Sequence, residues 1–195
     1  MLPADLGVAA EAGNLAGQAA ELLGGLDVVV NNAGIFVTHD IATLGQQAWQ
    51  KFWDRTLAVN LTGPANVIHG AVPFMEKAGG GHIINISSRG AYRGEPEAPA
   101  YGASKAGLNS LSQSLAVALA PRNIKVVALA PGWVLTDMTR SYLEGPAGKA
   151  IRNQSPMART ATADEIAHVV LMVISGRADA LSGGIIDINC ASHLR

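Results

Sequence analysis

Residues 82–88 read His82-Ile83-Ile84-Asn85-Ile86-Ser87-Ser88, a β-branched run that ends in two hydroxyl side chains. Such a run favours a short β-strand, and the small polar pair after it favours a turn. Three further segments have the same apolar character: Leu26–Val30, Ile124–Ala130 and Ile185–Ile188. The sequence therefore predicts at least four short strands that are apolar on both faces, which is typical of a covered parallel sheet.

Segments with helical periodicity separate these strands. A stripe of leucines and alanines precedes Gly24-Gly25, and a capping box opens a helix at Thr162-Ala163-Asp164-Glu165. The other expected helices cover Trp49–Leu57, Val67–Met75 and Tyr101–Ala120. Since strands and helices alternate, we expect one α/β domain over residues 1–195. The segment Trp133–Pro156 looks irregular and is predicted to be a mobile flap inside that domain.

Composition excludes several classes of protein. The chain has 195 residues, of which 49% are apolar and 15% charged, and its formal charge is −1, as expected for one compact soluble domain. A single cysteine, Cys190, and no secretory signature predict a cytoplasmic location. No apolar stretch approaches the ~20 residues of a membrane span. Without clustered Lys and Arg we expect no nucleic acid partner, and the five histidines lack metal-ligand spacing.

Two side chains within Tyr101-Gly102-Ala103-Ser104-Lys105 carry candidate chemistry. The phenol and the ammonium lie one helical turn apart on the same face, and a nearby cation favours the phenolate form. We therefore expect Lys105 to lower the pKa of Tyr101 and make it a proton carrier. Taken alone, an exposed helix pair is the better interpretation of this spacing.

Ser88 makes a catalytic role for Tyr101 and Lys105 the better interpretation. Ligands bind beyond the carboxyl ends of strands in an open parallel sheet, where Ser88 should meet the helix start that carries Tyr101. A hydroxyl donor there can hold a carbonyl oxygen while Tyr101 delivers a proton. The competing interpretation is a Ser-Ser turn that caps the next segment.

Taken together, the motifs resemble the short-chain dehydrogenase/reductase family. The resemblance rests on motifs that occur in the family's order and spacing: Asn31-Asn32-Ala33-Gly34, Asn60 in Val59-Asn60-Leu61-Thr62-Gly63, Ser88, Tyr101 with Lys105, and Pro131-Gly132-Trp133-Val134-Leu135-Thr136. It covers Asp5 to about Ile188. It implies a Rossmann-type, doubly wound parallel sheet, and an oxidoreductase that transfers a hydride between NAD or NADP and an alcohol/carbonyl substrate.

The resemblance also implies residue roles. Tyr101 would be the general acid/base, Lys105 would depress its pKa and bind the nicotinamide ribose, Ser88 would polarise the substrate carbonyl, and Asn60 would hold a water in the proton relay. The cofactor-binding residues it implies, besides Tyr101 and Lys105, are Asp5 and Leu6 at the adenine, Asn32, Ala33 and Gly34 beside the adenosine ribose, and Pro131, Gly132, Val134 and Thr136 on the nicotinamide side. Relatives pair through helices like Leu57–Met75 and Tyr101–Ala120, which implies a homo-dimer or homo-tetramer.

The sequence departs from the family at the phosphate-binding turn. A dinucleotide site of this type needs a glycine-rich turn after the first strand, and none is present. Gly13-Asn14-Leu15-Ala16-Gly17 imitates the glycine pattern, but it falls inside a predicted helix. We therefore expect the chain to lack strands 1 to 3 of the family fold, which is an N-terminal truncation. Leu26–Val30 then becomes an exposed edge strand.

A second departure lies at Ile188-Asn189-Cys190-Ala191, where the family usually has an acidic residue and two glycines. This leaves the turn after the last strand undetermined. The substrate would lie between the loop Arg89–Ala100 and the flap Trp133–Pro156. Their side chains select no substrate class: Tyr92, Arg93, Glu95, Trp133, Met138 and Tyr142.

Two hypotheses for the function follow. The first is the NAD(P)-dependent oxidoreductase. The alternative is a non-catalytic descendant that serves as a binding or oligomerisation module, because loss of the pyrophosphate contacts would weaken cofactor binding by several kcal/mol at ~1.5–3 kcal/mol per charge-assisted bond. For the same reason we expect little activity from these 195 residues by themselves.

Overall fold

The four predicted strands form one parallel sheet in the order β1-β2-β3-β4, in a computed structural model that describes all 195 residues. Their bounds are β1 Val28–Asn31, β2 Gly81–Ile86, β3 Ile124–Pro131 and β4 Ile185–Ile188. Sequential strands that pair in parallel need a crossover, and helices fill each connection. The predicted α/β class is confirmed.

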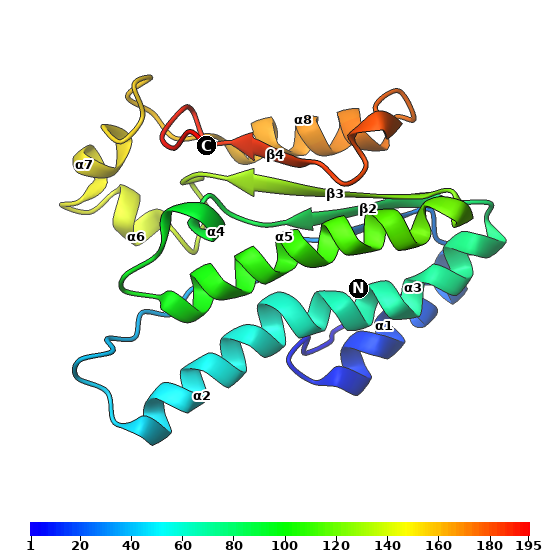
Figure 1. Cartoon of the computed structure of the whole chain (residues 1–195), viewed down its shortest axis with the longest axis horizontal. Coiled ribbons are helices and arrows are strands. Elements are labelled where there is room, and N and C mark those ends of the chain that lie inside the picture. Colours follow the sequence, from blue (N-terminus) through cyan, green and yellow to red (C-terminus); the bar gives the residue numbers. More distant parts are fainter.

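Helices cover both faces of the sheet (Figure 1). On one face lie α1 Ala9–Leu23, α3 Gly63–Lys77 and α5 Pro99–Leu119, with α2 Gln46–Leu57 leading into α3 through a π-helical turn, Ala58–Thr62. On the opposite face lies α8 Ala163–Ile174, which begins at the predicted capping box of Thr162 and Glu165. The short helices α4 Gly90–Arg93, α6 Arg140–Leu143 and α7 Gly148–Arg152 gather where the strands end.

Small residues set the packing of α1 against α3. Ala12, Ala16 and Ala20 are buried on one face of α1. A Cβ at Gly70 of α3 would lie 2.3 Å from the Gly13 carbonyl oxygen, so only glycine permits this approach. Gly13 therefore lies within a packed helix, in agreement with its rejection as a phosphate-binding turn.

The apolar core is divided between the two faces of the sheet. The larger cluster, which includes Ile68, Met75 and Ile83, packs beneath α1, α3 and α5. The smaller one joins Ile84, Val127, Leu129 and Val173 beneath α8. Because β2 and β3 are buried from both sides, their carboxyl ends are held in fixed positions.

Strand β1 pairs only with β2, as the sequence predicted for an edge strand. Val29 points into the core, whereas Val30 is 42% exposed. The edge therefore presents apolar surface together with unpaired backbone groups.

The flap Trp133–Pro156 is less irregular than the sequence predicted, since it contains α6 and α7. Arg152 ties the two helices together by donating a hydrogen bond from Nη1 to the Leu143 carbonyl oxygen, at 2.9 Å. Ser155 Oγ donates to the Cys190 carbonyl oxygen at 2.5 Å. The flap is thus bonded to the turn that follows β4.

That turn uses the left-handed conformation at Cys190 and Ala191, with φ values of 53° and 58°. Glycine adopts this conformation without strain. The geometry at this position is therefore one that two glycines would suit, although the chain has other residues there.

No helix of the chain combines the length and apolar character needed to cross a membrane. Likewise, His, Cys, Asp and Glu side chains form no group of three or more that could hold a metal ion.

Candidate active site

A cleft of about 620 Å³ runs along the carboxyl ends of the strands. It lies between the ends of β1, β2 and β3, the start of α5 and the start of α8. The predicted site residues that line it are Asn32, Ala33, Gly34, Ser88, Tyr101, Lys105, Pro131, Gly132, Val134 and Thr136. Segments distant in the sequence are thus brought to one surface, at the place where open parallel sheets bind ligands.

Ser88 follows the end of β2 and faces this cleft. Its Oγ accepts a hydrogen bond from the Gly90 amide at 3.0 Å. An accepted bond occupies one lone pair and leaves the hydroxyl hydrogen available for donation. Ser88 can therefore donate to an oxygen atom of a ligand in the cleft.

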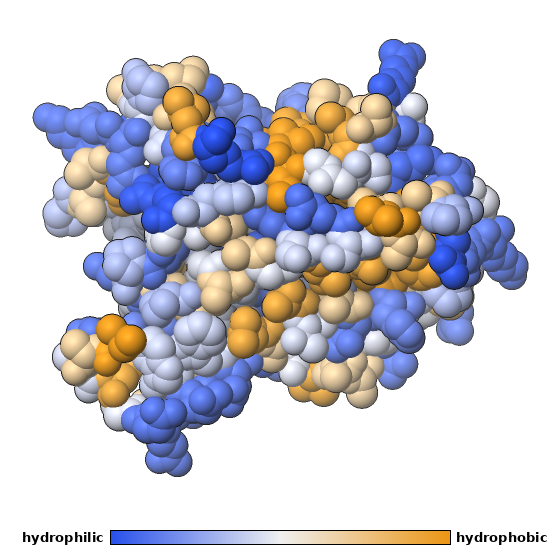
Figure 2. Space-filling model, in the orientation of Figure 1, coloured by the Kyte–Doolittle hydropathy of each residue, from blue (hydrophilic) through white to orange (hydrophobic).

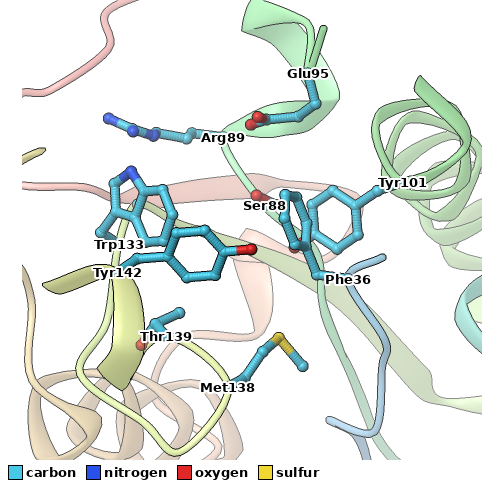
Figure 3. Close-up of a pocket in the computed structure, with 10 residues that line it drawn as sticks. Phe36, Ser88, Arg89, Glu95, Tyr101, Trp133, Met138, Thr139 and Tyr142 are labelled. Atoms are coloured by element: carbon cyan, nitrogen blue, oxygen red, sulfur yellow. The ribbon is translucent and has the colours of Figure 1, made fainter. Parts of the chain in front are cut away.

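Tyr101 lies in the first turn of α5, next to Ser88 (Figure 3). Its ring packs edge-to-face against Phe36, with the ring centroids 5.0 Å apart. Burial raises the pKa of the Tyr101 phenol, a hydrogen bond with Ser88 opposes this, and the charge of Glu95 adds to it. The phenol is therefore protonated at neutral pH.

Lys105 is buried one helical turn further along α5. Its Nζ donates to the Ile86 carbonyl oxygen at 2.8 Å and lies 5.7 Å from the centre of the Tyr101 ring. Burial lowers the pKa of Lys105 to about 8. The sequence predicted that Lys105 would lower the pKa of Tyr101. The pKa of Tyr101 is instead raised, because burial of the phenol outweighs its hydrogen bond with Ser88.

Asn60 occupies the π-helical turn between α2 and α3 and is fully buried. Its amide oxygen accepts from the Ile35 amide at 2.8 Å, and its amide nitrogen donates to the Ile35 carbonyl at 2.9 Å and to Ser104 Oγ at 3.1 Å. A Cβ at Gly34 would lie 3.3 Å from Asn60 Oδ1 and 3.5 Å from Lys105 Nζ. Asn60 thus fixes Ile35 in the loop after β1, next to Gly34, which borders Lys105.

The sequence did not predict a buried chain of hydrogen bonds that lies behind the cleft. Asn31 Nδ2 donates to Asn85 Oδ1 at 2.8 Å, Asn85 Nδ2 donates to Ser112 Oγ at 2.8 Å, and Ser112 Oγ donates to the Leu108 carbonyl at 2.7 Å. These bonds join β1, β2 and α5. The only signal in the sequence was the presence of polar residues in otherwise apolar strands.

A second, more open hollow of about 650 Å³ continues from the cleft and shares Ala33 and Gly34 with it. Asp5 and Leu6, predicted at the adenine, line this hollow. The Asp5 carboxylate accepts from the Gly7 amide at 2.8 Å and pairs with Arg55 at 3.1 Å. The structure therefore places every predicted cofactor residue along one continuous trough.

A smaller cavity of about 80 Å³ opens beside Ser88 and Tyr101 (Figure 3). Its other walls carry Phe36, from the segment after β1, and side chains from the two loops that were expected to hold the substrate: Arg89, Glu95, Trp133, Met138, Thr139 and Tyr142. Phe36, Arg89 and Thr139 were not predicted. Tyr92 and Arg93 lie outside, since Tyr92 packs against Arg195 and Arg93 donates to Gln154.

The comparisons with known proteins agree with this architecture. A family model described as enoyl-(acyl carrier protein) reductase matches residues 1–191. A 3-oxoacyl-[acyl-carrier-protein] reductase FabG of Aquifex aeolicus is 39% identical over 168 residues, which cover 86% of this chain and 66% of that protein. Human dehydrogenase/reductase SDR family member 4 is 31% identical over 91% of this chain and 63% of its own length.

Solved structures are similar as well. A protein described as a short-chain alcohol dehydrogenase from Sinorhizobium meliloti superposes with a TM-score of 0.89 at 32% identity, over 98% of this chain and 75% of that one. One described as an NAD(P)-dependent gluconate 5-dehydrogenase from Beutenbergia cavernae, with bound NADP, gives a TM-score of 0.88 at 28% identity over the same shares. The chain belongs to the short-chain dehydrogenase/reductase family. It spans just under two thirds of the length of the curated relatives it matches.

Proposed function

We propose that the protein is an NAD(P)-dependent oxidoreductase acting on an alcohol/carbonyl pair. The observation that carries this proposal is the meeting of two hydroxyl groups, Ser88 and Tyr101, at one cavity that opens onto the long cleft. Relatives described as reductases and dehydrogenases, one of them with bound NADP, support it.

The trough suits a nicotinamide dinucleotide. It is long, it runs past the strand ends, and Gly34 leaves open space beside Asn60 and Lys105 that a Cβ would crowd. The residues that would hold the cofactor are Asp5, Leu6, Asn32, Ala33, Gly34, Tyr101, Lys105, Pro131, Gly132, Val134 and Thr136. When bound, the cofactor supplies the hydride, so that the protein has only to bind, orient and move a proton.

Side chains of the chain perform the proton step. Ser88 donates its hydroxyl hydrogen to the carbonyl oxygen and holds it beside Tyr101. Tyr101, protonated at neutral pH because burial raises its pKa, gives its proton to that oxygen as the alcohol forms. Lys105 lies deeper in the cleft, where its bond to Ile86 keeps the ammonium next to Gly34. In the oxidation direction Tyr101 accepts the proton, which a higher pH favours.

The test is nicotinamide-dependent turnover of a carbonyl panel, followed at millimolar NADH or NADPH to offset weak cofactor binding. Tyr101→Phe keeps the ring and removes the proton, so turnover should fall by about 10²–10⁴-fold. Tyr92→Phe is the matched control, because Tyr92 lies outside the cleft, and it should keep the original rate. Unchanged turnover in Tyr101→Phe contradicts the proposal. Absence of turnover together with absence of cofactor binding favours the non-catalytic binding module instead.

A homo-oligomer is also part of the proposal. Figure 2 shows a band of apolar side chains over α5 and α3, and Val117 on α5 is 79% exposed. If a second copy of the chain covered this band, the association would remove apolar surface from water. Light scattering should give a dimer or tetramer, and a monomer at micromolar concentration would contradict this part.

A further inference from the structure

Glu95 provides an unused acceptor in the small cavity. It lies on the loop between α4 and α5, and its carboxylate points toward the space beside Ser88 (Figure 3). The side chain is partly buried, and no side-chain or backbone hydrogen bond acts on its pKa, which burial raises. No donor within the chain bonds to this carboxylate, so a ligand in the cavity that donates a hydrogen bond can pair with it.

The loop holds this carboxylate in place. A Cβ at Gly90 would lie 2.7 Å from Glu95 Oε1, so the glycine makes room for the acid. The Glu95 carbonyl accepts from the Ala98 amide at 3.0 Å, and Gly94 has a φ of 75° that suits glycine. Glu95 is therefore positioned by its backbone and not by an ion pair.

Neighbouring cations do not neutralise it by contact. Arg89 donates to Ser192 Oγ and to Gln154 Oε1, both at 2.5 Å, and Arg93 donates to Gln154 Oε1 at 3.1 Å. Both arginines act on Glu95 only through longer-range attraction, and Glu97 opposes them. A second cation in the cavity would be repelled by Arg89, so a neutral donor fits better than an ammonium group.

Aromatic rings make up much of the remaining wall. Phe36 and Trp133 both pack against Tyr142, with centroid separations of 6.4 Å and 5.7 Å. Flat rings contact the C–H faces of a compact substrate, while Glu95 accepts from a polar group on it. We propose, on the basis of the proposed function, that the substrate carries a hydroxyl group next to its reacting carbonyl and that this hydroxyl donates to Glu95, which makes Glu95 the residue that determines specificity.

Two ligands that differ in one group test this directly. 2-Hydroxycyclohexanone and 2-methylcyclohexanone have similar size, but only the first can donate. Binding to the whole chain, with and without NADPH, is measured by calorimetry or ligand-observed NMR and needs no turnover. The wild-type chain should prefer the hydroxy ketone by about ten- to hundredfold, the range of a hydrogen bond to a charged group.

Variants assign the preference to one side chain. Glu95→Met removes the acceptor at similar volume and should abolish or reverse the preference. Glu95→Gln keeps a neutral acceptor and should give an intermediate ratio. Glu97→Gln, an exposed acid two residues away, is the matched control and should behave as the wild type.

The outcomes separate this inference from the proposed function. Equal binding of the two ketones, no binding of either, or a preference that survives in Glu95→Met overturns the inference. A preference that Glu95→Met abolishes supports it, even if nicotinamide-dependent turnover fails. In that case only the oxidoreductase proposal is lost.

Discussion

The two ends of the trough are built in different ways. At the Tyr101 end, Asn60 and Lys105 are buried and each is bonded to backbone of another element. At the other end, the side chains of Asp5 and Arg55 are 44% and 51% exposed and form an ion pair, and Asp5 also accepts from the nearby Gly7 amide. The first end is fixed by the fold, whereas the second is a surface contact. Substitutions should therefore disturb the two ends very unequally.

The largest effect is expected in the buried network behind the Tyr101 end. Asn85→Ala removes the acceptor of Asn31 Nδ2 and the donor to Ser112 Oγ, and so breaks the bonds that join β1, β2 and α5. The free energy of unfolding should fall by about 2–4 kcal/mol, since each buried unsatisfied group costs ~1–3 kcal/mol. Urea denaturation measures this. Asn14→Ala, on the exposed face of α1, is the control and should leave stability unchanged or slightly raised.

A smaller effect is expected at Lys105. Its pKa of about 8 in the folded chain lies below the value of 10.5 that applies when the chain is unfolded, so the buried charge destabilises the fold at neutral pH. Lys105→Met should raise the free energy of unfolding at pH 7 by on the order of 2 kcal/mol while it impairs turnover.

The pH dependence of the free energy of unfolding shows whether charge burial causes the stability gain in Lys105→Met. Between pH 8 and pH 10.5 the unfolded chain binds more protons at this position than the folded chain, so the wild type gains stability as pH rises. The difference from Lys105→Met should therefore shrink across this window. A constant difference from pH 7 to pH 10.5 would show that packing, not charge burial, explains the effect.

The smallest effect is expected at the exposed end. Asp5→Ala removes both the ion pair with Arg55 and the exposed hydrogen bond from the Gly7 amide, and surface contacts of this kind contribute little to folding. The urea midpoint should not move measurably, and cofactor affinity should weaken by only about two- to tenfold, the range of one ordinary hydrogen bond. A large drop in stability would mean that the two ends are not built differently.

The sequence was sufficient to predict the strands, the alternation with helices and the convergence of Ser88, Tyr101 and Lys105. These follow from local patterns, and the carboxyl ends of parallel strands necessarily share one edge. The capping box at Thr162 was predictable for the same reason, because it depends only on neighbouring residues.

Other features depend on what the chain packs against. The pKa of Tyr101 shifts upward because the phenol is buried in the folded chain, and the charge of Glu95 adds to this shift. Glu95 was visible in its loop, but its lack of a partner depends on where Arg89 and Arg93 turn their side chains. The helices α6 and α7 were missed since each has only one turn and lacks a measurable period.

Transfer of a labelled hydride tests the central claim most directly. NADH and NADPH carrying deuterium at the transferring position are incubated with the chain and a carbonyl substrate, and the alcohol is analysed by mass spectrometry. The account predicts deuterium on the carbinol carbon with the wild type and with Tyr92→Phe, and almost none with Tyr101→Phe. Equal labelling by Tyr101→Phe, or no label with the wild type at saturating cofactor, would contradict it.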